Sequence, residues 1–181
     1  TSERAIWNNL EKIISHHNKW RLIITIFSSW ISRVQQIINA CEKYDKYIFL
    51  SGRSMVENIA IAKDLWYLKS KTGRIRKMTP KNTQWIPLDK QIIITTWSQW
   101  EEFSALTRMA EWRHNSIEIL AWDTIVFSSS VVPGNEKSVY WVINKLIKLW
   151  ANVITKDDGE VHTWGHAFQE EQKIMLNLVN A

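Results

Sequence analysis

Apolar residues alternate along the chain between two patterns, and the alternation predicts an α/β fold. Short runs that are apolar at nearly every position are typical of strands covered by helices on both sides. Such runs occupy residues 21–27, 47–50, 91–96, 116–120, 124–127 and 152–155. Between them, apolar residues spaced three and four apart predict amphipathic helices. These helices are expected at residues 2–17, 31–43, 54–65, 98–111, 136–149 and 168–179. This order favours a parallel sheet with helices on both faces.

The segment DTIVFSSSVVPGNEKSVYWVINKLIKL joins one of these strands to an amphipathic helix through a polar loop. Small hydroxyls and a helix N-terminus at the carboxyl edge of a parallel sheet are typical of phosphate sites in α/β proteins. An ordinary strand-to-helix turn, with Asn135 as the helix N-cap, explains the same residues equally well. The candidate phosphate ligands are Ser128, Ser129, Ser130, Gly134 and Asn135.

Two histidines, His162 and His166, follow at a spacing of four residues. Imidazoles can bind metal, transfer protons or hold a phosphate. On spacing alone, however, two polar loop histidines are the favoured interpretation. The other histidines are interpreted as surface residues without a role.

Composition narrows the function only slightly. The net charge is +5 and the isoelectric point is about 9.3, which permits a nucleic-acid partner. The basic stretch KSKTGRIRK, residues 69–77, is interpreted as a solvated loop in preference to an RNA contact. The single cysteine, Cys41, excludes an internal disulfide and fits a reducing compartment. No apolar run is long enough to span a bilayer, and no signal peptide precedes Thr1, so we expect no membrane association and a cytoplasmic fragment.

The chain has twelve tryptophans and only five glycines. Trp66 and Trp150 fall just past predicted helix ends, where a left-handed residue, normally glycine, ends the helix. Trp122 precedes a strand in a turn, and Trp97 and Trp100 flank a short polar loop. We hypothesise that most of these codons are UGA, read as glycine by some bacteria and as tryptophan in this translation. A protein naturally rich in tryptophan is the alternative.

Several long motifs resemble one family of nucleases. FSSSVVPGNEKSVYWVINKL and VHTWGHAFQEE, with SSWISRVQQIINA, LSGRSM and TTWSQWEEFSALTRMA in the same order, resemble the ribonuclease J family. The resemblance implies a metallo-β-lactamase-fold nuclease with an inserted β-CASP domain. It assigns residues 1–157 to a three-layer β-CASP domain. Residues 158–181 would be one strand and one helix returning to the metallo-β-lactamase domain.

The resemblance also implies roles for the candidate residues. The serine loop would line the RNA channel. His166, within Trp164-Gly165-His166-Ala167, matches the family's SGHA motif beside the scissile phosphate, and His162 would support it. Glu3 would be the acidic residue that precedes the first helix, although a carboxylate in a first helical turn has an equally good structural explanation. Glu101 is a rival acid.

The family's metal-binding HxHxDH cluster is not in this sequence. A two-metal hydrolase needs such clustered ligands. We therefore expect zinc to bind outside this chain, and the chain alone to be inactive. The complete enzyme would be a zinc-dependent ribonuclease that acts from the 5′ end, internally or both, in RNA processing and decay. RNA is the expected partner, and a homo-oligomer is one further expectation. The alternative is a stand-alone phosphate- or nucleotide-binding α/β module without catalysis.

Overall fold

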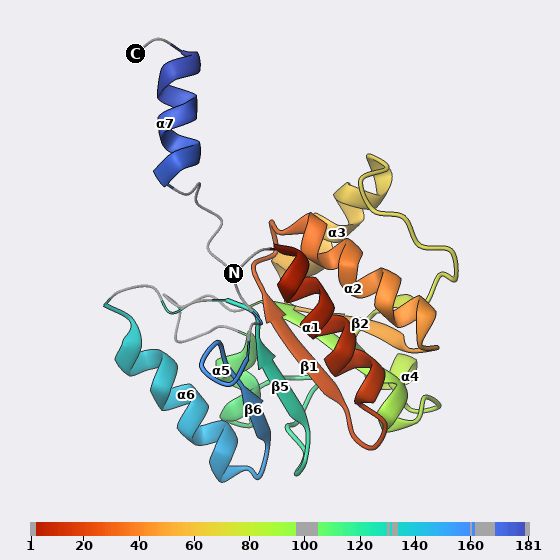
Figure 1. The fold of residues 1–181 in the computed structure, drawn as a ribbon. Helices are drawn as coiled ribbons and strands as arrows, with labels where there is room; N and C mark the ends of the chain where they lie inside the picture. The colour runs from red at the N-terminus through yellow and green to blue at the C-terminus, as the bar shows by residue number, and fades with distance from the viewer. Residues whose placement is uncertain are drawn as a thin grey trace.

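The computed structural model describes residues 3–96, 105–129, 131, 134–159, 161 and 169–179. Six parallel strands form one twisted sheet in the order β3-β2-β4-β1-β5-β6 (Figure 1). The strands are β1 (Leu22–Ile26), β2 (Tyr47–Ser51), β3 (Ile75–Lys77), β4 (Gln91–Thr96), β5 (Thr124–Phe127) and β6 (Asn152–Ile154). The predicted parallel α/β fold is confirmed.

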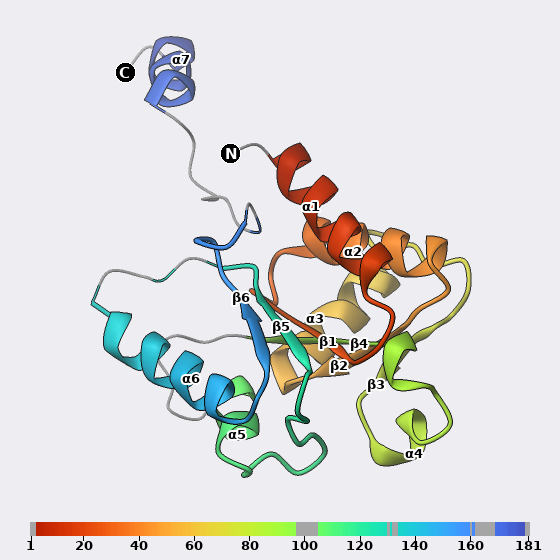
Figure 2. The same ribbon diagram turned by 60° about the horizontal axis from the view of Figure 1, so that its bottom comes forward.

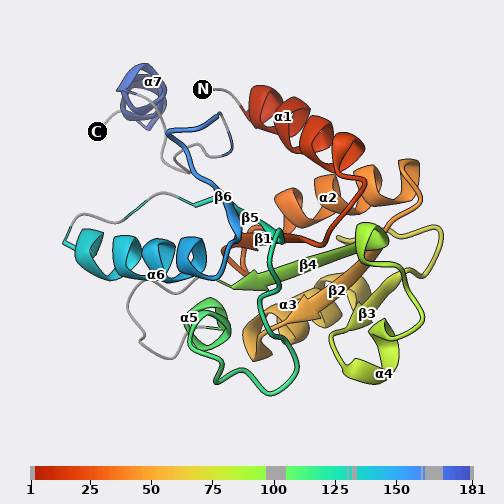
Figure 3. The same cartoon turned by 90° about the horizontal axis from the view of Figure 1, so that it is seen from below.

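Helices cover both faces of the sheet. They are α1 (Glu3–His16), α2 (Ile31–Lys43), α3 (Arg53–Asp64), α4 (Pro80–Thr83), α5 (Ala105–Ala110), α6 (Glu136–Lys148) and α7 (Gln169–Leu178), with a 3₁₀ turn η1 (Leu88–Lys90). Helices α1 and α2 lie on one side, and α5 and α6 lie on the other (Figures 2 and 3). Helix α3 packs on the side of α1 and α2, because its buried residues join the same core cluster. None of the described helices has the length and apolar character needed to cross a membrane.

The alternation of side chains along each strand divides the core into two layers. On β1, Leu22 and Ile24 face the layer under α1, α2 and α3, whereas Ile23 faces the layer under α5 and α6. All three side chains are fully buried. Burial of one such side chain stabilises the fold by about 1.5–3 kcal/mol. Strands covered on both faces gain this at successive positions, which explains why they are apolar throughout.

Three helices end in the same hydrogen-bonded motif, and tryptophan occupies its left-handed position. After α3, the amide of Trp66 donates to the carbonyl of Lys63 and the amide of Tyr67 donates to that of Ala62. These two bonds define a Schellman motif. The same pair of bonds follows α5 and α6, where Trp112 and Trp150 take the equivalent place.

Left-handed backbone is concentrated at tryptophan. The described non-glycine residues with positive φ are Asp45 at 56°, Trp66 at 63°, Trp112 at 61°, Trp122 at 72° and Trp150 at 60°. All four of these tryptophan side chains are exposed, by 59–81%. These four tryptophans therefore adopt a backbone conformation that normally requires glycine, and their large side chains gain little from burial.

A buried ion pair holds the amino-terminal edge of the sheet. The Arg21 guanidinium donates to both carboxylate oxygens of Asp123, at 3.0 and 2.5 Å, and to the carbonyl of Glu118 at 2.6 Å. The Asp123 side chain is fully buried and also accepts from the amide of Leu120 at 2.8 Å. Since ligands of parallel α/β sheets bind at the opposite, carboxyl edge, this pair has a structural role.

Three local predictions were wrong. Residues 116–120 form no strand, although Ile117 and Ile119 are buried as an alternating pattern requires. Residues 75–77, which were assigned to a solvated loop, form strand β3 and pair with β2. His17 and His114, which were interpreted as surface residues, are half-buried.

The last helix matches its prediction closely. Helix α7 extends away from the sheet (Figures 1 and 2), and no residue of it is buried. Its apolar residues Ile174, Met175 and Leu178 are exposed by 57%, 60% and 77%.

Candidate functional site

The carboxyl edge of the sheet contains a topological switch point. The chain leaves β1 for α2 on one face, and it continues from the adjacent strand β4 to α5 on the other face. Crevices for ligands form where neighbouring strands diverge in this way. Hydroxyl side chains gather along this edge, since Ser28, Ser51 and Ser128 lie at or just after the ends of β1, β2 and β5. The sheet therefore positions polar groups where such folds bind ligands.

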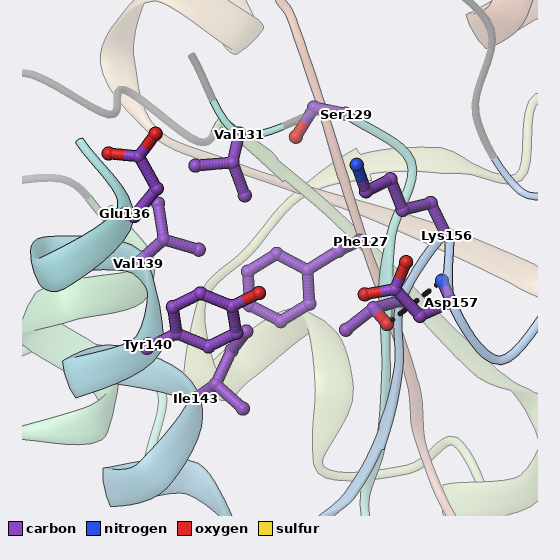
Figure 4. Close-up of a pocket in the computed structure, with 10 residues that line it drawn as sticks. Phe127, Ser129, Val131, Glu136, Val139, Tyr140, Ile143, Lys156 and Asp157 are labelled. Atoms are coloured by element: carbon purple, nitrogen blue, oxygen red, sulfur yellow. Dashed lines mark hydrogen bonds between the residues drawn. The ribbon is translucent and has the colours of Figure 1, made fainter. Parts of the chain in front are cut away.

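A cavity of about 180 Å³ opens beside the end of β5 (Figure 4). Phe127 forms its floor, Glu136, Val139, Tyr140 and Ile143 line it from α6, and Lys156 and Asp157 approach from the loop after β6. This volume is smaller than the roughly 300–1,000 Å³ of pockets for drug-sized ligands. The cavity therefore has room for a group such as a phosphate rather than a whole nucleotide. We call it the serine cavity.

Two polar side chains of the loop between β5 and α6 lack hydrogen-bond partners within the described structure. Ser129 lines the serine cavity, and its Oγ is buried without a partner within the described structure. The Nδ2 of Asn135, the N-cap residue of α6, is also buried without one. A buried polar group without a partner costs about 1–3 kcal/mol, so each is well suited to bind a ligand atom. The predicted Asn135 N-cap is confirmed, but its side chain makes no capping bond.

Gly134 is already engaged within the loop. Its amide donates to the Glu136 carboxylate at 2.9 Å. The amide of Glu136 itself and this bond hold the pKa of the Glu136 carboxyl below its usual value. Gly134 has a φ of 95°, a conformation that favours glycine. The described structure thus gives this residue a turn-forming role, and its binding of phosphate stays a prediction.

Ser128 lies deeper, where its hydroxyl connects three segments of the chain. Its Oγ accepts a hydrogen bond from Arg33 Nη1 and donates one to the carbonyl of Val161, both at 2.6 Å. Ser128 and Val161 are fully buried or nearly so, and Arg33 is 1% exposed. The hydroxyl therefore anchors the residue immediately before His162 to the end of β5. Its predicted contact with phosphate stays a prediction.

The other predicted site residues fall outside the described part of the structure. Ser130, His162 and His166 lie in undescribed segments, and Glu3 is described only as the first backbone position of α1. The predicted residues that the structure brings to one loop are therefore Ser128, Ser129, Gly134 and Asn135. The roles of the two histidines and of Glu3 stay predictions.

The described residues do not fit a zinc centre. Within the described ranges, no three side chains of His, Cys, Asp or Glu are grouped closely enough to hold a metal ion. Cys41 is a buried residue of α2, and burial raises the pKa of its thiol well above the usual range.

Sequence reasoning missed Arg33 and Lys156. A buried guanidinium stacked 5.1 Å from the Trp30 ring centroid is unexpected on a helix whose apolar spacing is regular. Helical spacing could have identified it, because Arg33 lies four residues before Ile37 and shares the buried face of α2 with it. Lys156 directly follows a predicted strand, and nothing in the local sequence indicates that this strand, β6, pairs with β5.

Comparison with known proteins agrees with this architecture. The family model for the ribonuclease J β-CASP domain matches residues 19–146. The chain is 38% identical to ribonuclease J of Mycolicibacterium smegmatis over 178 residues, and 40% identical to that of Thermus thermophilus over 177. These alignments cover 98% of the chain but only 31% and 30% of the two relatives. Ribonuclease J of Helicobacter pylori is 41% identical over 159 residues, which is 88% of the chain and 23% of that relative. The chain belongs to the ribonuclease J β-CASP domain family.

Proposed function

We propose that this chain is the RNA-clamping part of a zinc-dependent ribonuclease. The complete protein would cleave RNA from the 5′ end, internally or both, during RNA processing and decay. Family membership supports this proposal, because the relatives that match the chain are named as ribonucleases. In the complete protein, RNA would pass along the carboxyl edge of the sheet, and this chain would hold its phosphates.

The buried hydroxyl of Ser129 carries the proposal. It lies at the edge where α/β proteins bind ligands, it lines a cavity of about 180 Å³, and it has no partner within the described structure. A phosphate oxygen would satisfy it. The ammonium of Lys156, which lines the same cavity, would balance part of the phosphate charge.

The remaining site residues are proposed from the family resemblance. His166 would bind or protonate the phosphate at the leaving group, His162 would support it, and Glu3 would be a further acid. One contact supports this proposal for the two histidines. The Ser128 hydroxyl donates to the carbonyl of Val161, the residue immediately before His162. Two zinc ions would be held by residues outside this chain and would activate the attacking water.

The test compares two RNA substrates in the complete protein from the reading frame that contains this chain. Ser129→Ala should lower kcat/KM for 5′-monophosphorylated RNA by about 10- to 100-fold. This corresponds to about 1.5–3 kcal/mol for a hydrogen bond to a charged group. Cleavage of the same RNA with a 5′-hydroxyl should change little, because it has no terminal phosphate to lose.

Ser138→Ala is the matched control. Ser138 is exposed in the first turn of α6 and does not line the serine cavity. Equal losses on both substrates, or equal effects of the two substitutions, would contradict a phosphate contact at Ser129. An inactive complete protein with zinc supplied would refute the ribonuclease and favour a stand-alone binding module.

A further inference from the structure

A second, larger cavity lies on the other half of the same sheet edge. The ends of β2 and β3, the first turn of α3 and the segment after α5 enclose about 590 Å³. This volume is within the range typical of ligand sites. Strand β2 is three positions from β5 in the sheet, so these two strands lie about 14 Å apart at about 4.8 Å per strand, and the two cavities share no lining residue. The two cavities are therefore separate.

The charged side chains of this second cavity are mostly cationic. Arg53, Lys77 and Arg108 line it, and the carboxylate of Glu57 is paired with Arg53 at 2.8 Å. The lining residues thus carry three positive charges and one negative charge. The Nε of Arg108 is buried and has no hydrogen-bond partner in the described structure. We call this site the basic cavity.

The one histidine of the basic cavity is arranged as a hydrogen-bond donor. The Nδ1 of His114 accepts from the amide of Ser116 at 3.2 Å, so in the neutral ring the proton is on Nε2. That Nε2 is 3.2 Å from Ser51 Oγ and therefore donates to it. Burial, and secondarily the charge of Arg108, lowers the pKa of His114 and favours this neutral form.

The hydrogen bond between His114 and Ser51 indicates that Ser51 binds a ligand and does not act as a nucleophile. A serine nucleophile needs a base that accepts its proton, but His114 Nε2 already carries one. The Ser51 hydroxyl instead accepts from the histidine, which leaves its own proton to be donated to a ligand. Ser51 is only 3% exposed, so its position is fixed by the surrounding structure. Its hydroxyl is a donor, like the cationic groups around it.

Gly52 brings the start of α3 to the same cavity. Its φ is 95°, and a Cβ at this position would lie 2.9 Å from Thr96 Oγ1, so only glycine fits. The 12-residue helix begins immediately after it, with no side-chain cap and no acidic residue in the first turn. The amides of this turn therefore add to a lining already rich in donors.

We propose that the basic cavity binds an internal backbone phosphate of a single RNA strand whose end occupies the serine cavity. This proposal rests on the RNA substrate of the proposed function. The ligand is an anion because the donors described above converge on the cavity. It is an internal phosphate because the two cavities share no lining residue and lie at strands three positions apart, so an RNA strand whose end occupies the serine cavity reaches the basic cavity only further along its backbone.

The experiment measures RNA binding by the complete protein. The probes are 5′-phosphorylated, 2′-O-methylated oligouridylates, which resist cleavage. One is a dinucleotide and the other has about twelve nucleotides, within the site sizes of single-strand binding folds. Fluorescence anisotropy gives Kd for each probe as a function of salt. The variant is Arg53→Ala with Lys77→Ala, and both of these side chains are exposed at the cavity rim.

For the longer probe, the double variant should weaken binding at least tenfold at low salt. The slope of log Kd against log salt should fall by about 0.7 for each phosphate that the variant no longer neutralises. Affinity for the dinucleotide should not change, because that probe cannot extend from the serine cavity to the basic cavity. The matched control is Lys12→Ala with Lys63→Ala, which removes the same charge from positions outside the cavity.

Three results would overturn the proposal. Unchanged binding of the longer probe would show that the basic cavity contacts no RNA. Equal losses in the variant and the control would indicate general electrostatic attraction. A matching loss for the dinucleotide would show that the cavity binds small nucleotides instead of a strand. Cleavage assays on the unmodified protein test the proposed ribonuclease separately, so the two failures are distinguishable.

Discussion

Replacing tryptophan by glycine at four left-handed positions should stabilise this chain. The positions are Trp66, Trp112, Trp122 and Trp150. A left-handed conformation costs an L-residue about 1–2 kcal/mol. Glycine avoids this cost, but its freedom in the unfolded chain offsets about 0.4–1 kcal/mol of the gain. The net gain is about 1 kcal/mol at each position, because side chains that are 59–81% exposed contribute little burial.

The four substitutions together should therefore raise the free energy of unfolding by about 4 kcal/mol. In a chain of this size, 1 kcal/mol shifts the melting temperature by about 2–4 °C, so the combined shift is about 8–16 °C. Urea unfolding followed by circular dichroism measures the free energy. Trp122 and Trp150 share a backbone hydrogen bond of 2.8 Å, so these two effects should be coupled, whereas the others should add.

Trp141→Gly is the control, and its effect should have the opposite sign. Trp141 lies inside α6, and Lys145 Nζ is 4.1 Å from the centroid of its ring. Glycine in a helix interior costs about 1 kcal/mol, and loss of the cation–π contact adds about 0.5–1 kcal/mol. Destabilisation at the four left-handed positions, or stabilisation at Trp141, would refute the reasoning. UGG codons in the source DNA would refute the codon hypothesis independently.

Two further predictions concern charged groups. Arg74 and Lys90 lower the pKa of Asp45 to about 2, from 3.8, chiefly through the hydrogen bond from Lys90. A depressed carboxyl pKa stabilises the fold above about pH 4 and loses that contribution as pH falls toward 2. Asparagine at this position also tolerates the left-handed backbone, so Asp45→Asn is a suitable variant. The difference in free energy of unfolding between the unsubstituted protein and Asp45→Asn should shrink as the pH falls over this range. A difference that stays constant with pH would contradict the assignment. Asp123→Ala leaves the buried Arg21 guanidinium without its carboxylate. The free energy of unfolding, measured in urea, should fall by about 3–5 kcal/mol. A fall below about 1 kcal/mol would argue against a buried ion pair.

The elements of the fold were largely predictable because burial on both faces leaves a clear pattern. Residues 91–96 and 124–127 could only be strands, since their runs are too short for helices and rich in β-branched residues. Residues 116–120 show the limit of this reasoning. Their alternation satisfies burial, but a strand also needs a neighbouring strand to pair with, and residues 116–120 pair with none of the described strands.

At the tryptophan positions, the type of residue and the backbone conformation disagree, because tryptophan stands where the structure has left-handed backbone. Helix endings predicted glycine-like backbone at Trp66 and Trp150, and both have it. Trp112 also directly follows a predicted helix, residues 98–111, so the same argument applied to it but was not made. The backbone requirement is set by the two hydrogen bonds of the motif and not by the type of residue at that position.

The candidate site was predicted less well, because its chemistry depends on contacts between distant segments. Sequence reasoning grouped the serines of one loop as equal phosphate ligands. The structure separates them, since the Ser128 hydroxyl is occupied by Arg33 and Val161, whereas the Ser129 hydroxyl is unpaired in a cavity within the described structure. Arg33, which contributes to this difference, lies 95 positions from Ser128 in the sequence.

The two cavities also differ in a way that bears on function. The serine cavity has a single described cation, Lys156, beside the carboxylates of Glu136 and Asp157. Acidic neighbours weaken general attraction for RNA, so that cavity should select by hydrogen-bond geometry. The basic cavity has an excess of positive charge and should supply most of the salt-dependent affinity. One sheet edge would thus separate recognition of an RNA end from retention of the strand behind it.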